Sequence, residues 1–406
     1  MLDFKSFLKE ETLLLEKAET SDLEADDKGK MHELLLAKHL HPATTLPEHH
    51  RSFSDNEDHA GTPEQVHDRL KQKIGPAAYA EIDEHAKQTA EHIKKQLDQH
   101  GHTGNGITIG NVHWTSNADK PNVAGDHEKT VGVKDVNSNA DLITTLHKDG
   151  KPVGHIGISA KYGSQEPNYR NPGVDSLEKT AGLPPGTLQK HMDIHKEHMD
   201  ALGHHGSADQ RNIQTKIDEM GIDKAREEHA KHEGALASGK TLSGKNKVMH
   251  AQLSAFIKAH DSLPAKKQAE FLAKAKQRSE MARSSNIAAR TAATADFANA
   301  LSKHDDAKLR DVIRGNVSPP THIPHYVAHS KVKTDGSAES IIKPSHTLAD
   351  EHLAKFEGLH VAPGAGTTLT IKGKHRESGK TMTVARYTLK SSSGAHKGIA
   401  GSFKLK

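Results

Sequence analysis

Apolar residues recur every three to four positions through the first quarter of the chain, which is the spacing of amphipathic helices. Thr62 followed by Pro63 marks a helix start, because threonine caps helices and proline is accepted in the first turn. The run Asp26–Gly29 separates the first two apolar faces. We therefore predict helices over residues 2–19, residues 30–40, Pro63–Ile74 and Pro76–His100.

Beyond the glycine-rich stop at Gly101–Gly106 the apolar period changes to alternation, which is typical of strands. The run Lys148–Lys151 has the composition of a hairpin turn. The alternating segments are Ile107–Trp114, Lys129–Val133, Asp141–Leu146 and Val153–Ala160. A small mixed or antiparallel sheet is therefore expected after the helices.

The second half of the chain divides into a helical and a strand-like part. Residues 187–310 are rich in Ala, Lys, Gln and Glu, whereas alternation returns after Ser318. The later strands are predicted at His325–Val332, Thr367–Lys374, Thr381–Ser391 and Ser402–Lys406. The predicted fold class is α+β, with a leader-like segment (1–29), an α/β core (30–185), a helical region (186–317) and a β-rich C-terminal domain (318–406).

Composition narrows the class of protein. Hydrophobic residues make up 33% of the 406 residues and aromatics 3%, so several small cores are expected instead of one large core. The absence of cysteine excludes disulfides, thiolate zinc sites and cysteine nucleophiles, and it suits a reducing cytoplasm. No apolar run approaches the roughly 20 residues of a membrane span, and the N-terminus has no secretory signal pattern, so neither a membrane partner nor secretion is expected.

One acid and one lysine stand at corresponding ends of two predicted neighbouring strands. Asp141 begins the first of these strands and Lys161 follows the second. Hydrolysis of a phosphodiester needs an acid to hold a divalent cation, and a lysine that orients water or neutralises developing charge assists it. This pair predicts a metal-dependent phosphodiester hydrolase, and an ordinary hairpin with polar ends is the competing interpretation.

The same segment resembles the PD-(D/E)xK nuclease superfamily, whose core has the restriction-endonuclease-like fold. Asp141 matches the first acid of the motif, Lys161 matches the lysine, and Ser159 stands where the family has its middle acid. The resemblance implies a DNA endonuclease that binds Mg²⁺ or Mn²⁺ through Asp141 and the Ala160 carbonyl. It leaves a homodimer open.

In that superfamily another acid often comes from a helix that precedes the sheet. Glu33 is the candidate for this role, as both a catalytic and a metal-binding residue, with Glu81 and Glu84 as alternatives. The ordinary interpretation of each is a solvated glutamate on an amphipathic helix.

A polar, glycine-containing segment follows Lys161. Within it, Tyr162 is a candidate for contacting nucleic acid, Tyr169 for stacking on a base, and Arg170 for binding a phosphate. A plain surface loop is the competing interpretation.

The run Asp3–Glu11 is similar to the amphipathic leaders of T-even-like tailed phages. The runs Val112–Ser116 and Tyr162–Ser164 resemble uncharacterised proteins of marine phages in the same group. In those phages such leaders direct internal proteins into the prohead. The alternative function is therefore a non-enzymatic phage structural or internal head protein, with capsid or prohead proteins as partners. The expected location is the host cytoplasm or the virion interior.

Histidine is unusually frequent, with 33 residues. Two groups have helical or strand spacing, and we interpret them as solvated faces, with a metal-binding module as the alternative. The groups are His191, His195 and His198, and His322, His325 and His329.

Overall fold

In a computed structural model the chain forms two compact units. The described residues are 25–46, 61–114, 140–165, 167–239, 241–242, 244–318, 323–364, 366–391 and 399–406. The first unit comprises Met1–Arg170, Arg310–Phe356 and Lys404–Lys406, and the second comprises Asn171–Leu309 and Glu357–Phe403. The predicted leader (residues 2–19) and the predicted strand at 129–133 lie outside the described residues. The α+β class is confirmed: helices precede a small mixed sheet, and a helical middle region precedes a β-rich end.

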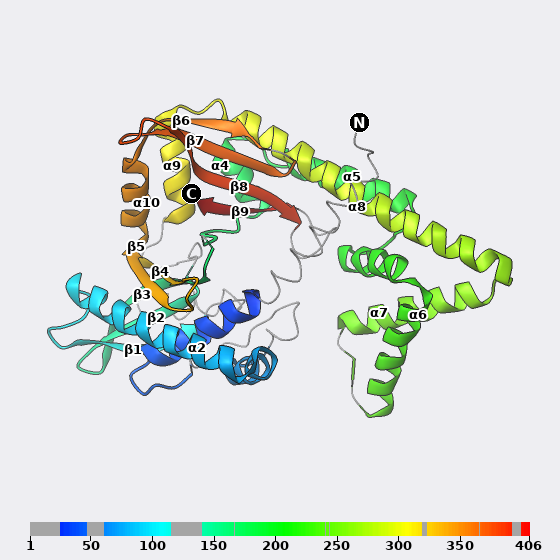
Figure 1. Cartoon of the computed structure of the whole chain (residues 1–406), viewed down its shortest axis with the longest axis horizontal. Helices are drawn as coiled ribbons and strands as arrows, with labels where there is room; N and C mark the ends of the chain where they lie inside the picture. The colour runs from blue at the N-terminus through cyan, green and yellow to red at the C-terminus, as the bar shows by residue number, and fades with distance from the viewer. Residues whose placement is uncertain are drawn as a thin grey trace. The chain divides into compact units, whose positions relative to one another are not determined.

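The first unit begins with two helical segments that lie against one sheet (Figure 1). The first helix spans residues 25–40, so the break predicted at Asp26–Gly29 is wrong. The second, α2 (Pro63–Gln99), starts with a capping box in which the side chains of Thr62 and Gln65 each accept from the other's backbone N–H. Gly75 has φ 81° and interrupts α2 just before Pro76, which is where two helices were predicted to meet.

The sheet of the first unit has five strands in the order β1-β2-β3-β4-β5. Strand β3 pairs in parallel with β4, and the other neighbours pair antiparallel. The β2–β3 turn places Asp149 and Gly150 at φ 51° and 73°, the left-handed backbone that tight hairpins require. The strands are β1 (Ile107–Trp114), β2 (Leu142–Lys148), β3 (Lys151–Gly163), β4 (His325–Val332) and β5 (Ala338–Pro344).

The last two strands of this sheet come from the segment that was predicted to be a separate C-terminal domain. The predicted boundary at residue 318 therefore differs from the structure, where β4 lies next to β3. The first six residues of β4 are buried, as befits an interior strand. Alternation indicates that a segment is a strand but not which strand it pairs with, and the parallel partner of β4 is more than 160 residues away.

The core of the first unit lies between the two helices and the sheet. Leu34 and Leu35 of the first helix, and Ile82 and Ile93 of α2, are almost fully buried there. Alternate residues of β3 face the same core: Ile156, Ile158 and Ala160, with Tyr162 packed against them. Ser159 and Lys161 occupy the intervening positions and share a face of β3.

The second unit combines long helices with a four-stranded sheet of order β6-β7-β8-β9 (Figure 1). Helix α6 is interrupted at Gly221, where φ is 75°, a left-handed backbone that glycine adopts readily. The helices are α4 (Val174–Ala181), α5 (Gln189–Ala201), α6 (Ala208–Ala237), α7 (Gly244–Asp261) and α8 (Ala265–Leu301). The strands are β6 (Phe356–Pro363), β7 (Thr368–His375), β8 (Thr381–Ser391) and β9 (Ile399–Leu405).

Two further helices are α9 (Asp306–Val317), which crosses the unit boundary between Leu309 and Arg310, and α10 (Ser345–Ala354), which belongs to the first unit. Neither α10 nor β5 and β6 was predicted individually, because short segments carry too few apolar positions to establish a period. Across the described ranges, no helix has both the length and the apolarity needed to cross a bilayer.

Candidate active site

The acid and the lysine expected on neighbouring strands lie in direct contact. Asp141 immediately precedes β2, and its backbone N–H donates to the Ile158 carbonyl at 2.9 Å. Its Oδ2 accepts from Lys161 Nζ at 3.1 Å and from Ser159 Oγ at 3.2 Å. The Asp141 and Lys161 side chains are 21% and 19% exposed, so the ion pair is shielded yet still open to a small ligand.

Glu33 brings a second carboxylate to this ion pair from the first helix. The residue is 8% exposed, and its Oε2 accepts from Trp114 Nε1 at 2.9 Å and from Lys30 Nζ at 3.1 Å. Burial raises the pKa of Glu33, and the nearby charge of Asp141 adds to the rise, against the opposing effects of Lys30, the Trp114 bond and Lys161. Glu33 is therefore within electrostatic reach of both Asp141 and Lys161.

Lys30 completes the charge pattern and was not identified from the sequence. Burial acts to lower its pKa, but the attraction of Glu33 and Asp141 outweighs burial and raises the pKa. The ammonium group is thus held in its charged form. The sequence feature that could have identified Lys30 is its position three residues before Glu33 on one helix, since residues three apart are neighbours on a helix surface.

His325 lies beside the same ion pair, and its ring nitrogens make no hydrogen bond to the described residues. The residue is 6% exposed. Burial lowers its pKa to about 4, with Asp141 opposing and Lys161 adding to the effect. It pairs in register with Gly157, where an added Cβ would stand 3.0 Å from His325 Cδ2.

The histidine group at the start of β4 is therefore not a solvated face, and that prediction is wrong. His329 is 6% exposed and its Nε2 lies 3.2 Å from the Gly163 carbonyl, while His322 lies outside the described residues. Both described histidines are buried because β4 is an interior strand.

The Ala160 carbonyl was the predicted backbone ligand. Carbonyls two residues apart in a strand point to the same side, and the Ile158 carbonyl accepts from Asp141 N. The Ala160 carbonyl is accordingly directed to the side on which β2 begins, which is also the side of Asp141.

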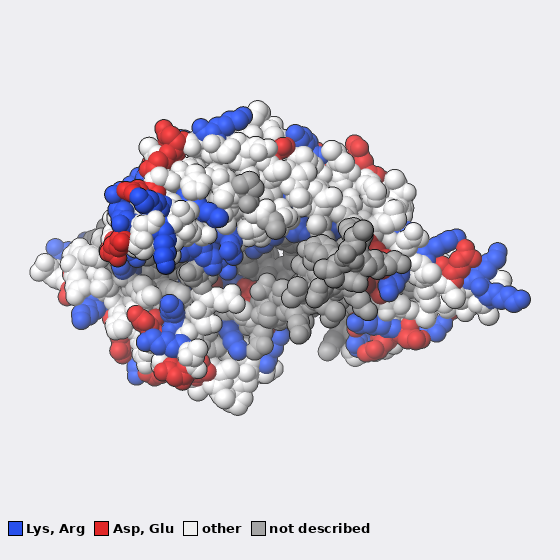
Figure 2. Space-filling model, turned by 45° about the horizontal axis from the view of Figure 1, so that its top comes forward, with Lys and Arg blue, Asp and Glu red and all other residues white. Residues whose placement is uncertain are grey.

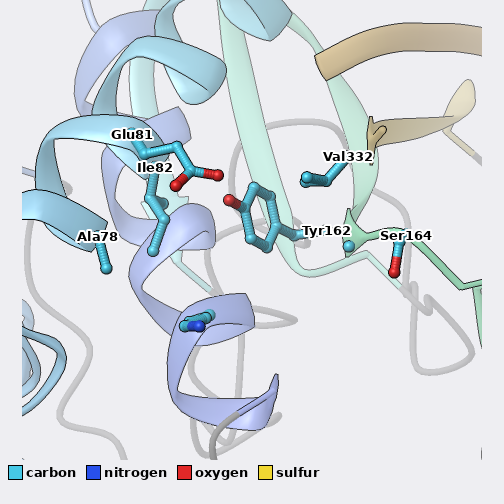
Figure 3. A pocket seen from close by; sticks show the side chains of 8 residues that line it. Ala78, Glu81, Ile82, Tyr162, Ser164 and Val332 are labelled. Atoms are coloured by element: carbon cyan, nitrogen blue, oxygen red, sulfur yellow. The ribbon is translucent and has the colours of Figure 1, made fainter. Parts of the chain in front are cut away.

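Tyr162 lines a cavity of about 200 Å³ at the end of β3 (Figure 3). One face of its ring stacks on His32 at a centroid distance of 4.9 Å, and its hydroxyl lies 3.3 Å from His85 Nδ1. Burial, with a smaller effect of Glu81, raises the pKa of Tyr162 to about 12. The ring of this candidate nucleic-acid-binding residue is therefore half-buried and held by protein contacts.

The remaining predicted site residues are placed as follows. Glu81 borders the cavity opposite the Tyr162 hydroxyl (Figure 3), whereas Glu84 is exposed and accepts from Gln88. Arg170 donates to the Gly315 carbonyl at 3.4 Å, and Tyr169 is half-buried, so this loop is anchored to protein.

The histidine group on α5 was interpreted as a solvated face, and this is wrong for two of its members. His195 is 2% exposed with Nδ1 2.9 Å from Ser285 Oγ, and His191 Nε2 lies 2.9 Å from Asp296 Oδ2. Only His198 is exposed. The separate partners of His191 and His195 indicate packing and ion-pair roles for them.

On the face of the molecule drawn in Figure 2, charges of both signs are mixed, and the net charge of the chain is +3. In this view, the densest group of Lys and Arg side chains lies in the left half.

Comparisons with protein-family models, with curated proteins and with solved structures find no match to this chain. Its function is therefore inferred from the geometry of the site.

Proposed function

We propose that this protein is a metal-dependent phosphodiester hydrolase that acts on DNA, with its active site at Asp141, Glu33 and Lys161. The observation that carries the proposal is the 3.1 Å contact between Asp141 and Lys161, with the buried Glu33 carboxylate in electrostatic reach of both. Asp141 and Lys161 come from the two strands of one hairpin, and Glu33 comes from a helix more than 100 residues earlier in the chain. Two of the three groups are acids inside a largely buried site.

The donor set fits a hard divalent cation. Mg²⁺ binds through one or two carboxylates and keeps several waters, and Asp141 and Glu33 supply two carboxylates with the Ala160 carbonyl on the same side. The unpartnered ring nitrogens of buried His325 show that polar capacity beside Asp141 remains unused in the described residues. Bound there, Mg²⁺ or Mn²⁺ would polarise the phosphate and lower the pKa of a coordinated water.

The charge balance favours joint binding of cation and substrate. Lys30 and Lys161 each contact one carboxylate, so the four groups together are close to neutral. A dication added alone would leave a buried positive excess, which is unfavourable in a partly desolvated site. A phosphodiester brings negative charge, so the metal is expected to bind more tightly when DNA is present.

Lys161 and Ser159 have different roles in the proposed reaction. In this proposal the Lys161 side chain turns away from Asp141 to orient the attacking water or to neutralise charge on the phosphate. Asp141 would then be free to bind the cation. Ser159 stands where the PD-(D/E)xK superfamily has an acid, and here it donates to Asp141 and holds that carboxylate in place. Two carboxylates suit one hydrated cation, so a single-metal site is proposed.

The test is cleavage of supercoiled plasmid with Mg²⁺ or Mn²⁺ by four purified proteins: wild type, Asp141→Asn, Lys161→Met and the matched control Asp149→Asn. Asp149 is exposed in the β2–β3 turn and tolerates asparagine at its left-handed φ. Wild type and Asp149→Asn should cleave, and the two site variants should lose about a hundredfold or more. Equal cleavage by all four proteins would reject this active site. No metal-dependent cleavage by wild type would reject the hydrolase and leave the non-enzymatic head protein.

A further inference from the structure

We propose that α6 and α7 of the second unit carry a transition-metal site, for Zn²⁺ or a similar ion, formed by His229, Glu233 and His250. This inference is independent of the proposed hydrolase. Among the described residues, this is the one group of three histidine or acidic side chains whose ligand atoms all lie within 4.8 Å of one another.

The separations between the donor atoms suit a tetrahedral ion. Glu233 Oε1 lies 2.6 Å from His250 Nε2 and 4.0 Å from His229 Nε2. Zinc bonds of about 2.0–2.1 Å place neighbouring tetrahedral ligand atoms about 3.4 Å apart, and the observed separations bracket that value. Small side-chain rotations are sufficient to bring all three donors onto one ion.

The sequence spacing and the packing of the helices explain why these groups meet. His229 and Glu233 are four residues apart on α6 and share one face. His250 comes from α7, which packs on α6 through a common core that includes Ile217, Leu253 and Phe256. The core fixes the two helices, so the donors above it are held in place before any ion binds.

The surroundings of the three donors are rich in imidazole. The rings of His229 and His250 are stacked at 4.6 Å with an angle of 13° between planes, and the ring of His232 lies 6.1 Å from that of His250. Two stacked imidazoles repel each other when both are protonated, whereas a shared cation binds their neutral forms. Glu233 supplies the anionic donor that offsets part of the ion's charge.

The chemistry of the donors selects the class of metal. Imidazole suits Zn²⁺, Ni²⁺, Co²⁺ and Cu²⁺, while Mg²⁺ prefers oxygen donors, so this site and the Asp141 site are expected to take different ions. Three protein ligands leave one position for water or for a further side chain. The bound ion would cross-link α6 to α7.

The experiment uses the full chain and measures Zn²⁺ binding by competition with a chromophoric chelator and by metal analysis after dialysis. The variants are Glu233→Gln and His250→Gln, and the matched control is His198→Gln, since His198 is exposed on another helix of the same unit. Wild type and His198→Gln should hold one equivalent of zinc more than the two site variants, whose affinity should fall at least about tenfold.

Two further readouts keep the test decisive. Glu233 is 56% exposed, so Glu233→Gln should leave the fold intact, and circular dichroism checks this point. Zn²⁺ should raise the melting temperature of wild type and not that of Glu233→Gln, because a ligand that binds only the native state stabilises it. Substituted Co²⁺ should give the intense visible absorption of a tetrahedral site. Unchanged stoichiometry and affinity in both site variants would overturn the proposal and identify the zinc as adventitious.

Discussion

The indole nitrogen of Trp114 donates a 2.9 Å hydrogen bond to Oε2 of Glu33, 81 residues earlier in the chain. Trp114 is the only tryptophan, and it ends β1 opposite Leu142, the residue that follows Asp141. A strand side chain thus fixes a helix carboxylate next to the start of β2. The two acids of the proposed site therefore owe their relative position to one buried bond between a helix and the sheet.

Removing this bond should destabilise the first unit. Trp114→Phe leaves the buried Glu33 carboxylate without one donor, and bonds to charged groups contribute about 1.5–3 kcal/mol. Urea unfolding should show a loss of that order. In a double-mutant cycle with Glu33→Met, which removes the acceptor, a coupling energy above about 1 kcal/mol is expected, and strictly additive effects would contradict the assigned contact.

Ser159 should act on catalysis through Asp141. Ser159→Ala removes the 3.2 Å bond to Asp141 Oδ2 and allows the carboxylate to turn. A hydrogen bond to a carboxylate contributes about 1.4 kcal/mol or more, which corresponds to a tenfold change in rate. Plasmid cleavage should therefore slow by about tenfold, and the metal concentration for half-maximal rate should rise. Ser378→Ala, an exposed serine in the β7–β8 turn, is the control and should leave both values unchanged. Loss of cleavage rate with unaltered metal dependence would argue against this role.

Buried histidine makes the first unit sensitive to acid. His32 is fully buried with Nε2 2.8 Å from Ser330 Oγ, and burial, with smaller effects of His85 and His329, lowers its pKa to about 3. Between its ordinary pKa of 6.5 and this value the unfolded chain binds the proton and the folded chain does not. Stability from neutral His32 is therefore complete above pH 6.5 and declines as the pH falls, by about 1.4 kcal/mol per pH unit.

Urea unfolding at pH 7.5 and pH 5, in the presence of EDTA, measures this dependence. The free energy of unfolding of wild type should fall by about 2 kcal/mol more than that of His32→Gln, which cannot take up the proton. The same pH dependence in both proteins would show that His32 is not held neutral.

A buried ion-pair network should dominate the stability of the helical part of the second unit. Asp218 on α6 is 2% exposed, accepts two bonds from Arg278 of α8 at 2.9 and 3.1 Å, and lies 3.0 Å from His204 Nε2. Burial acts to raise its pKa, but these bonds outweigh burial and lower it. Its contribution is thus present above its ordinary pKa of 3.8 and is lost as the pH falls below it.

Asp218→Asn should lower the free energy of unfolding by about 1.5–3 kcal/mol, since it removes the charge that strengthens the two bonds to Arg278, whose side chain is 32% exposed. Asp223→Asn, at an exposed position of the same helix, should change it by less than about 0.5 kcal/mol. Comparable effects of the two substitutions, measured by urea unfolding, would contradict the network.

The sequence by itself determined what depends on near neighbours. Thr62 and Pro63 mark the start of α2, Gly75 marks its interruption, and Asp149 and Gly150 mark the β2–β3 turn, because capping, helix breaking and left-handed backbone involve only a few consecutive residues. The Asp141–Lys161 contact was predictable for a related reason, since a short hairpin fixes the register of the two strands that carry these residues.

Tertiary structure alone decided what depends on contacts between distant segments. It placed β4 beside β3, buried His325 next to Asp141, joined Trp114 to Glu33, and brought His250 to Glu233. Apolar periodicity states which face of an element is buried but not which element covers it, so these partners could not be read from local pattern. They were selected by the packing of the two cores, which is a property of the whole chain.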